Sequence, residues 1–240
     1  AKNFSLNDMI NPIAVKEMRQ GVKGKAIAWA LIIYLILQLI IIGSFMIFSE
    51  SMTQNFNMGR EVFIALLGVL LGVNLLFVPT ITAMRLASER SGENVDLLFI
   101  TTLKPFSIIW GKTLAASTIA LLLFSAALPF MTLTYLLRGL DLPSIFILMG
   151  LDFLIVIGCV IFGILLGAMP GGLIAKGFRF LVGIGAMFIV FYALMASSAS
   201  MIFFGIGSTI NTWAFWGPAL TFLILALLAI GLMFICAVTI

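Results

Sequence analysis

The stretch AIAWALIIYLILQLIIIGSFMIF, residues 26–48, decides the fold. Its 23 residues contain only one strongly polar side chain, that of Gln38. A helix needs about 20 mostly apolar residues to cross the hydrocarbon core of a bilayer. Five further stretches of this kind follow, at residues 62–84, 113–137, 144–168, 180–204 and 216–240. The sequence therefore predicts an all-α, polytopic membrane protein with six transmembrane helices.

The composition excludes a water-soluble protein. Apolar residues make up 63% of the 240 residues and charged residues 9%, against about 45–50% and about 25% in soluble domains. The chain has no histidine, and its two cysteines, Cys159 and Cys236, lie inside apolar stretches. These features argue against a metal site, a disulfide framework and histidine-based catalysis. We expect no nucleic-acid partner either.

The positive charges are distributed unequally between the two sides of the predicted bundle. Eleven of the 13 Lys and Arg residues precede the first span or lie in the connections after the second and fourth spans. Only Arg60 and Arg138 fall on the other side. The positive-inside rule places the larger group in the cytoplasm. We therefore expect cytoplasmic termini and a location in the lipid bilayer of a plasma membrane of the bacterial inner-membrane type.

Residues 1–25 form a separate cytoplasmic segment before the first span. Asn11-Pro12 is typical of a helix start, and Lys16 and Arg19 lie on the face opposite an apolar one. Glu17 interrupts the apolar face and requires a partner. This pattern predicts an amphipathic helix lying in the membrane interface. An ordinary basic flank to the first span is the alternative.

The connection 85–107 carries the most informative pattern. It begins with the polar sequence SERSGEN at residues 88–94, which suits the first turn of a helix. The run VDLLFITTL at residues 95–103 is too short to cross a bilayer, and Lys104-Pro105 closes it. On a helix, its apolar side chains occupy two faces, which require two burial partners. We predict that one partner is another subunit. An interfacial helix packed wholly within this chain is the alternative.

No enzyme motif is present in the sequence. Gly111-Lys112-Thr113 resembles the end of a phosphate-binding loop, but Phe106 stands where its first glycine is required and no strand precedes it. Lys112 is better explained as a cation that extends from the inner end of the third span towards the lipid headgroups. We therefore expect no enzymatic activity, no cofactor and no metal in this chain.

Asp152 is the one clearly ionisable side chain within the predicted spans. A charge at mid-membrane costs about 2.5–3.5 kcal/mol, so the carboxylate must face protein or water. It pairs with Arg138, reaches the outer interface, or lines a substrate path. Asn74 is a candidate for the same path or for a hydrogen bond between helices. The pairs Gly68-x-x-x-Gly72 and Gly163-x-x-x-Gly167 predict close helix packing.

Two stretches resemble the permeases of type 2 ATP-binding-cassette (ABC) exporters. NPIAVKEMR at residues 11–19 resembles the amphipathic entry helix of that family. ERSGENVDLLFITTL at residues 89–103, followed by Gly111-Lys112, is similar to the segment between its second and third spans. That segment has an acidic-basic-x-glycine start, a leucine-rich helix, a Thr-Thr-x-Leu end and a Gly-Lys pair that opens the next span. The chain departs from the pattern at Glu93-Asn94, where a threonine commonly follows the glycine.

The resemblance implies a mechanism and a set of partners. In such permeases the segment between spans two and three is a short coupling helix that docks on a separate cytoplasmic ABC ATPase subunit. Two six-span units, identical or different, pair around the transport path, and the partner ATPase holds the ATP and Mg²⁺. The residues to which we assign coupling are Glu89, Arg90, Asp96, Leu97, Phe99 and Ile100.

Two other functions stay open at this stage. One is a non-transporting scaffold or assembly subunit of a membrane complex, and the other is a secondary transporter. The scarcity of ionisable side chains within the spans disfavours the secondary transporter. For a transporter, the substrate is open among lipid, drug, polysaccharide, peptide and ion.

Overall fold

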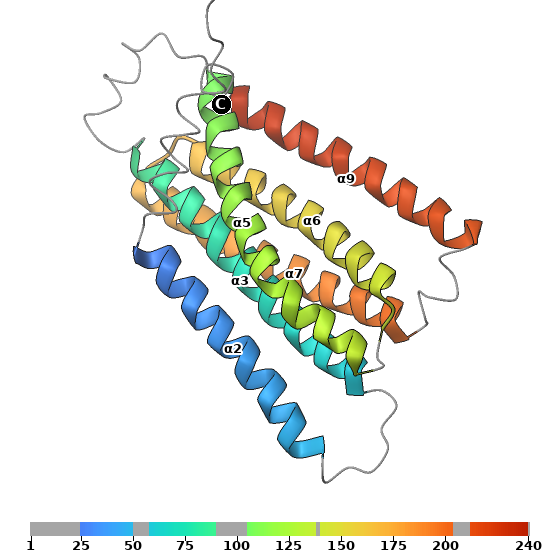
Figure 1. The fold of residues 1–240 in the computed structure, drawn as a ribbon. Coiled ribbons are helices and arrows are strands. Elements are labelled where there is room, and N and C mark those ends of the chain that lie inside the picture. The colour runs from blue at the N-terminus through green and yellow to red at the C-terminus, as the bar shows by residue number, and fades with distance from the viewer. Residues whose placement is uncertain (1–24, 50–57, 90–104, 138–139, 204–211, 240) are drawn as a thin grey trace, which may run out of the picture.

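The computed structural model of the protein is a bundle of long helices (Figure 1). It describes residues 25–49, 58–89, 105–137, 140–203 and 212–239. Within these ranges every regular element is an α-helix. The helices are α2 (Lys25–Ser49), α3 (Met58–Glu89), α5 (Pro105–Leu136), α6 (Leu142–Ala168), α7 (Leu173–Phe203) and α9 (Trp213–Thr239).

Each of these six helices is long and apolar enough to cross a membrane. Their apolar spans contain 21 to 31 residues, which at about 1.5 Å per residue equals or exceeds the thickness of a bilayer core, about 30 Å. The sequence of α2 shows the reason, because apolar residues surround its whole circumference. A helix of that kind is stable only within lipid or within protein. The prediction of an all-α membrane protein with six spans is confirmed.

The helix ends differ most from the predicted spans at the starts of α5 and α7 and at the end of α3. α7 begins at Leu173 rather than at residue 180. α3 continues beyond residue 84 to Glu89, because Arg85-Leu86-Ala87 favours a helix and no helix-breaking residue interrupts it. α5 begins at Pro105 rather than at residue 113, because proline suits the first position of a helix. The connection between α3 and α5 therefore shortens to residues 90–104.

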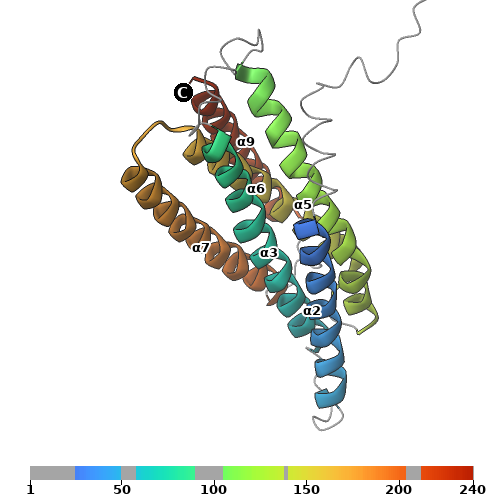
Figure 2. The same cartoon turned by 90° about the vertical axis from the view of Figure 1, so that its left-hand side faces the viewer.

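The core of the bundle consists of α3, α5 and α6, with α2, α7 and α9 around them (Figures 1 and 2). In the most apolar stretch of α3, 56% of the residues are buried inside the bundle. In the most apolar stretch of α9, only 6% are buried. The end of α9 packs on the start of α5, where the ring of Phe234 lies 5.4 Å from that of Phe106 and 5.7 Å from that of Trp110. Lipid can cover the apolar side chains that the outer helices expose.

Two glycines of α6 allow its backbone to approach that of α3 closely. A Cβ atom at Gly163 would lie 2.8 Å from the carbonyl oxygen of Pro79, and one at Gly167 would lie 2.7 Å from that of Ala83. The order of these contacts shows that α3 and α6 run in the same direction. The packing predicted for this glycine pair is confirmed, and its partner is α3.

Charged side chains mark the two ends of the bundle. We call the end at which α3 finishes and α5 begins the basic end. On α3, α5 and α7, the positively charged residues near this end are Arg85, Lys112, Lys176 and Arg179. Arg60, Glu61 and Asp141 lie near the opposite end. The assignment of the basic end to the cytoplasm stays a prediction from the charge distribution.

We expect Gly163→Ala and Gly167→Ala each to destabilise the protein by about 1–3 kcal/mol, because the added methyl group forces α3 and α6 apart. Gly150→Ala is the matched control, since it lies in the same helix and a Cβ atom there would meet nothing within 4 Å. The free energy of unfolding in mixed micelles measures the difference. An equal loss of stability in all three variants would show that the α3–α6 contact is not limiting.

Candidate functional site

The segment assigned to coupling lies between two helices that enter the core of the bundle. α3 ends at Glu89 and α5 begins at Pro105, so both helices meet the segment 90–104 at the basic end. Glu89 is the last residue of α3. The remaining residues predicted for coupling, and those predicted for the interfacial helix, lie outside the described residues: Arg90, Asp96, Leu97, Phe99, Ile100, Lys16, Glu17 and Arg19.

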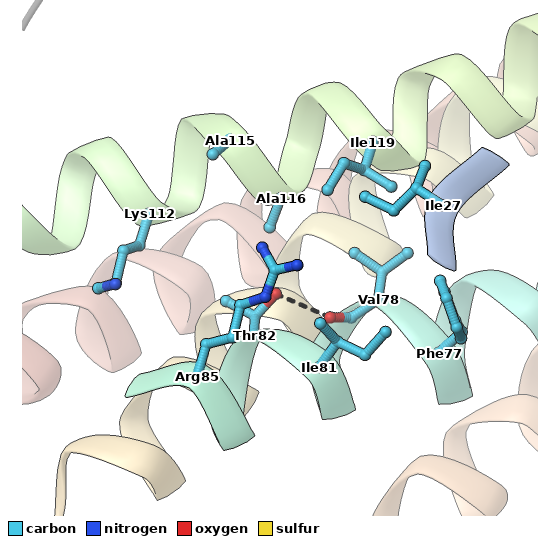
Figure 3. A pocket seen from close by; sticks show the side chains of 10 residues that line it. All are labelled: Ile27, Phe77, Val78, Ile81, Thr82, Arg85, Lys112, Ala115, Ala116 and Ile119. Atoms are coloured by element: carbon cyan, nitrogen blue, oxygen red, sulfur yellow. Dashed lines mark hydrogen bonds between the residues drawn. The ribbon is translucent and has the colours of Figure 1, made fainter. Parts of the chain in front are cut away.

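A small cavity lies beside this junction, between α2, α3 and α5 (Figure 3). Arg85 points from α3 towards α5, and Lys112 points from α5 towards α3. Thr82 lies beneath them, and its hydroxyl donates a hydrogen bond of 2.7 Å to the carbonyl oxygen of Val78. The cavity measures about 30 Å³, which holds about one or two water molecules. It is therefore too small for a lipid, drug, polysaccharide or peptide substrate, and apart from Thr82, Arg85 and Lys112 its lining is apolar.

The position of Lys112 differs from the sequence prediction. We expected its ammonium group to extend towards lipid headgroups, but its side chain is only 4% exposed. The reason is the early start of α5 at Pro105, which places Lys112 about two turns inside the helix and against α3. Lys112 thus belongs to the packing between α3 and α5.

Asp152 lies in the middle of the bundle and contacts α7. It follows the start of α6 by ten residues, or about 15 Å, and it is 3% exposed. Its carboxylate accepts a hydrogen bond from the hydroxyl of Ser198, which is also buried. The second carboxylate oxygen, Oδ2, has no hydrogen-bond partner among the described residues. Arg138, the partner considered from the sequence, lies outside the described residues.

Asn74 is fully buried in α3, but it does not lie beside Asp152. Its Nδ2 donates a hydrogen bond of 2.9 Å to the carbonyl oxygen of Leu70, and its Oδ1 lacks a partner in the described part of the chain. Gly72, two residues earlier, faces Phe191 of α7. Two residues correspond to about 200° around a helix, so Asn74 faces away from α7. Asn74 and Asp152 therefore do not form one site.

A third buried polar group lies in α2. Gln38 and Tyr34 are both fully buried, and the Gln38 amide donates a hydrogen bond to the Tyr34 hydroxyl. The Gln38 Oε1 atom, like Asp152 Oδ2 and Asn74 Oδ1, is buried and accepts no hydrogen bond within the described ranges. Burying an unpartnered polar atom costs about 1–3 kcal/mol. The described part of the bundle thus contains three acceptor atoms whose burial is unfavourable, one each on α2, α3 and α6.

Sequence reasoning did not identify Ser198 or the Tyr34–Gln38 pair as candidate site residues. The spacing of four residues between Tyr34 and Gln38 was a usable signal, because side chains so spaced meet on a helix. Ser198 gave no such signal, since its partner lies 46 residues earlier in the sequence. The described residues contain no group of three or more Cys, Asp or Glu side chains arranged to hold a metal ion.

We expect Ser198→Ala to destabilise the protein by about 1–2 kcal/mol, because it removes the hydrogen bond to Asp152. Ser200→Ala is the matched control, since the exposed Ser200 hydroxyl donates only to the Ser197 carbonyl oxygen of its own helix. A double-mutant cycle of Ser198→Ala with Asp152→Leu, which removes the acceptor, followed by reversible unfolding in micelles, measures the coupling. Strict additivity of the two substitutions would contradict the contact.

Comparison with known proteins adds no assignment to this geometry. No family model matches the chain, and no curated protein is similar to it.

Proposed function

We propose that this protein is the membrane-spanning permease subunit of an ATP-driven ABC exporter. A separate cytoplasmic ATPase binds and hydrolyses ATP, and the segment 90–104 receives the resulting movement. The proposal combines the sequence pattern at residues 89–103 and 111–112 with the position of that segment between α3 and α5. The arrangement of these two helices is the observation that carries it.

α3 and α5 are long enough, and packed closely enough, to carry a movement of the segment 90–104 into the centre of the bundle. Each contains 32 residues, or about 48 Å, whereas the hydrocarbon core of a bilayer is about 30 Å thick. They pack on each other, and both pack on α6. A force applied to the segment 90–104 therefore acts on the central helices of the bundle and not on a loosely attached one.

The proposed cycle follows from this geometry. When the ATPase closes on ATP, it moves the segment 90–104, and α3 and α5 shift together relative to the outer helices. Opening after hydrolysis reverses the shift, so that the path is exposed alternately to the two sides of the membrane. A second six-span unit, identical or different, completes the path. The cavity of Figure 3 is too small to hold a lipid, drug, polysaccharide or peptide.

Ion-coupled secondary transport is the second candidate, and Asp152 is the observation that favours it. A buried carboxylate with one unpartnered oxygen at mid-membrane is a group that a proton or cation could bind. The Ser198 contact is a sufficient structural explanation of its position, so the ATP-driven mechanism is preferred.

We expect Leu97→Glu and Phe99→Glu to abolish association with the ATPase, because charged side chains in an apolar docking surface are left buried and unpaired. The measurement starts with the tagged chain purified from its native membrane. The co-purifying ATPase is identified by its phosphate-binding loop, and its rate is measured in nanodiscs. We expect that rate to fall at least about tenfold, with membrane insertion unchanged.

Leu136→Glu is the control for this experiment. It introduces the same charge at the opposite end of α5, where the leucine side chain is 72% exposed. Full ATPase yield and rate in the Leu97 and Phe99 variants would refute coupling through this segment. An ATPase rate that is independent of the chain would instead favour a scaffold or a secondary transporter.

A further inference from the structure

A second cavity at the basic end lies on the other side of α3, between α3, α6 and α7. It measures about 270 Å³, much more than the cavity of Figure 3. Figure 2 shows α7 diverging from α3 towards this end, so the helices leave room there. Lys176 and Arg179 of α7 line this cavity together with Thr80 of α3, and none of the described residues that line it is acidic.

The guanidinium group of Arg179 packs against the turn between α6 and α7. Its Nε donates a hydrogen bond of 3.1 Å to the carbonyl oxygen of Ala175. Its Nη2 is buried and lacks an acceptor among the described residues. A Cβ atom at Gly171, in the turn between α6 and α7, would lie 2.6 Å from Nη2. Because glycine has no Cβ, the guanidinium can lie under this turn.

This arrangement leaves a donor for the cavity. The guanidinium has five N–H groups in one plane. Nε is paired within the helix and Nη2 is covered by the turn, so the Nη1 edge remains for the cavity that Arg179 lines. Lys176 precedes Arg179 by three residues and therefore lies on the same helix face. Two cations thus share one opening.

The rest of the cavity is apolar. Met84, Leu166, Phe180, Ile184 and Met187 form its walls. Lys176 and Arg179 follow the start of α7 by three and six residues, or about 5 and 9 Å, which is close to the level of lipid headgroups. A cationic opening above an apolar interior complements an amphiphile that has an anionic headgroup and a hydrocarbon chain. A small water-soluble anion would leave the apolar walls unused.

We propose that this cavity binds an anionic glycerophospholipid of the leaflet at the basic end. Its phosphate accepts hydrogen bonds from Arg179 and Lys176, and one acyl chain lies between α7 and the pair formed by α3 and α6. The site does not depend on the exporter proposal, because it requires only the six-helix fold in a bilayer.

Titration of the purified protein with phosphatidylglycerol, followed by native mass spectrometry, tests the site. We expect Arg179→Gln to weaken binding about tenfold, because a hydrogen bond between charged groups is lost. Gly171→Ala should weaken binding as well, since its methyl group displaces the guanidinium while both charges remain. Gly172→Ala is the matched control, because a Cβ atom there meets nothing within 4 Å. Circular dichroism verifies that each variant is folded.

Four outcomes would overturn the proposal. Unchanged binding in the Arg179 and Gly171 variants would show that Arg179 serves another partner, such as an acidic side chain of this protein. An equal loss in Arg85→Gln, on the opposite side of α3, would indicate general electrostatic attraction. Equal binding of phosphatidylcholine would indicate an apolar groove without headgroup recognition. Competition by glycerol phosphate at the affinity of the lipid would indicate a free-phosphate site.

Discussion

The close contact between α3 and α6 is the constraint on which the rest of the bundle depends. The carbonyl oxygens of Pro79 and Ala83 lie only 2.8 and 2.7 Å from where Cβ atoms would stand at Gly163 and Gly167, so this contact requires glycine at both positions. α5 separates the two helices in sequence and packs on both. In lipid, helices associate through such close packing, because burying apolar surface from lipid gains little. The three central helices therefore form one body, to which α2, α7 and α9 attach with less burial.

This central body also separates the polar groups of the membrane interior. Asp152 turns to Ser198 of α7, whereas Asn74 lies on the face of α3 that points away from α7. In the observed conformation Asp152 therefore anchors α7 to α6, and its burial leaves it closed to any path. A direct role in transport would require α7 to move away from α6, which would break the contact with Ser198. The packing of α7 on α6 thus keeps the Asp152 carboxylate buried, whereas a direct role in transport would require it to be exposed.

The sequence was sufficient for the six spans and for the packing of Gly163 and Gly167, because both follow from local patterns of apolar and small residues. It failed where the result depends on neighbours in space. Hydropathy locates the lipid-covered part of a helix but not its last hydrogen-bonded turn, so the start at Pro105 and the burial of Lys112 were missed. The contact of Asp152 with Ser198 and the position of Arg179 under Gly171 join residues from different elements, which no local spacing predicts.

The cations of the basic end have different surroundings, although the positive-inside rule treats them alike. Arg85 and Lys112 line the small cavity between α2, α3 and α5, whereas Lys176 and Arg179 lie where α7 diverges from α3. At the second pair, the proposed lipid would fill space that protein side chains leave open. A fluid acyl chain can follow a change in the distance between α3 and α7, whereas a close-packed core resists it. A lipid there would let the central helices shift without opening an empty cavity beside α7.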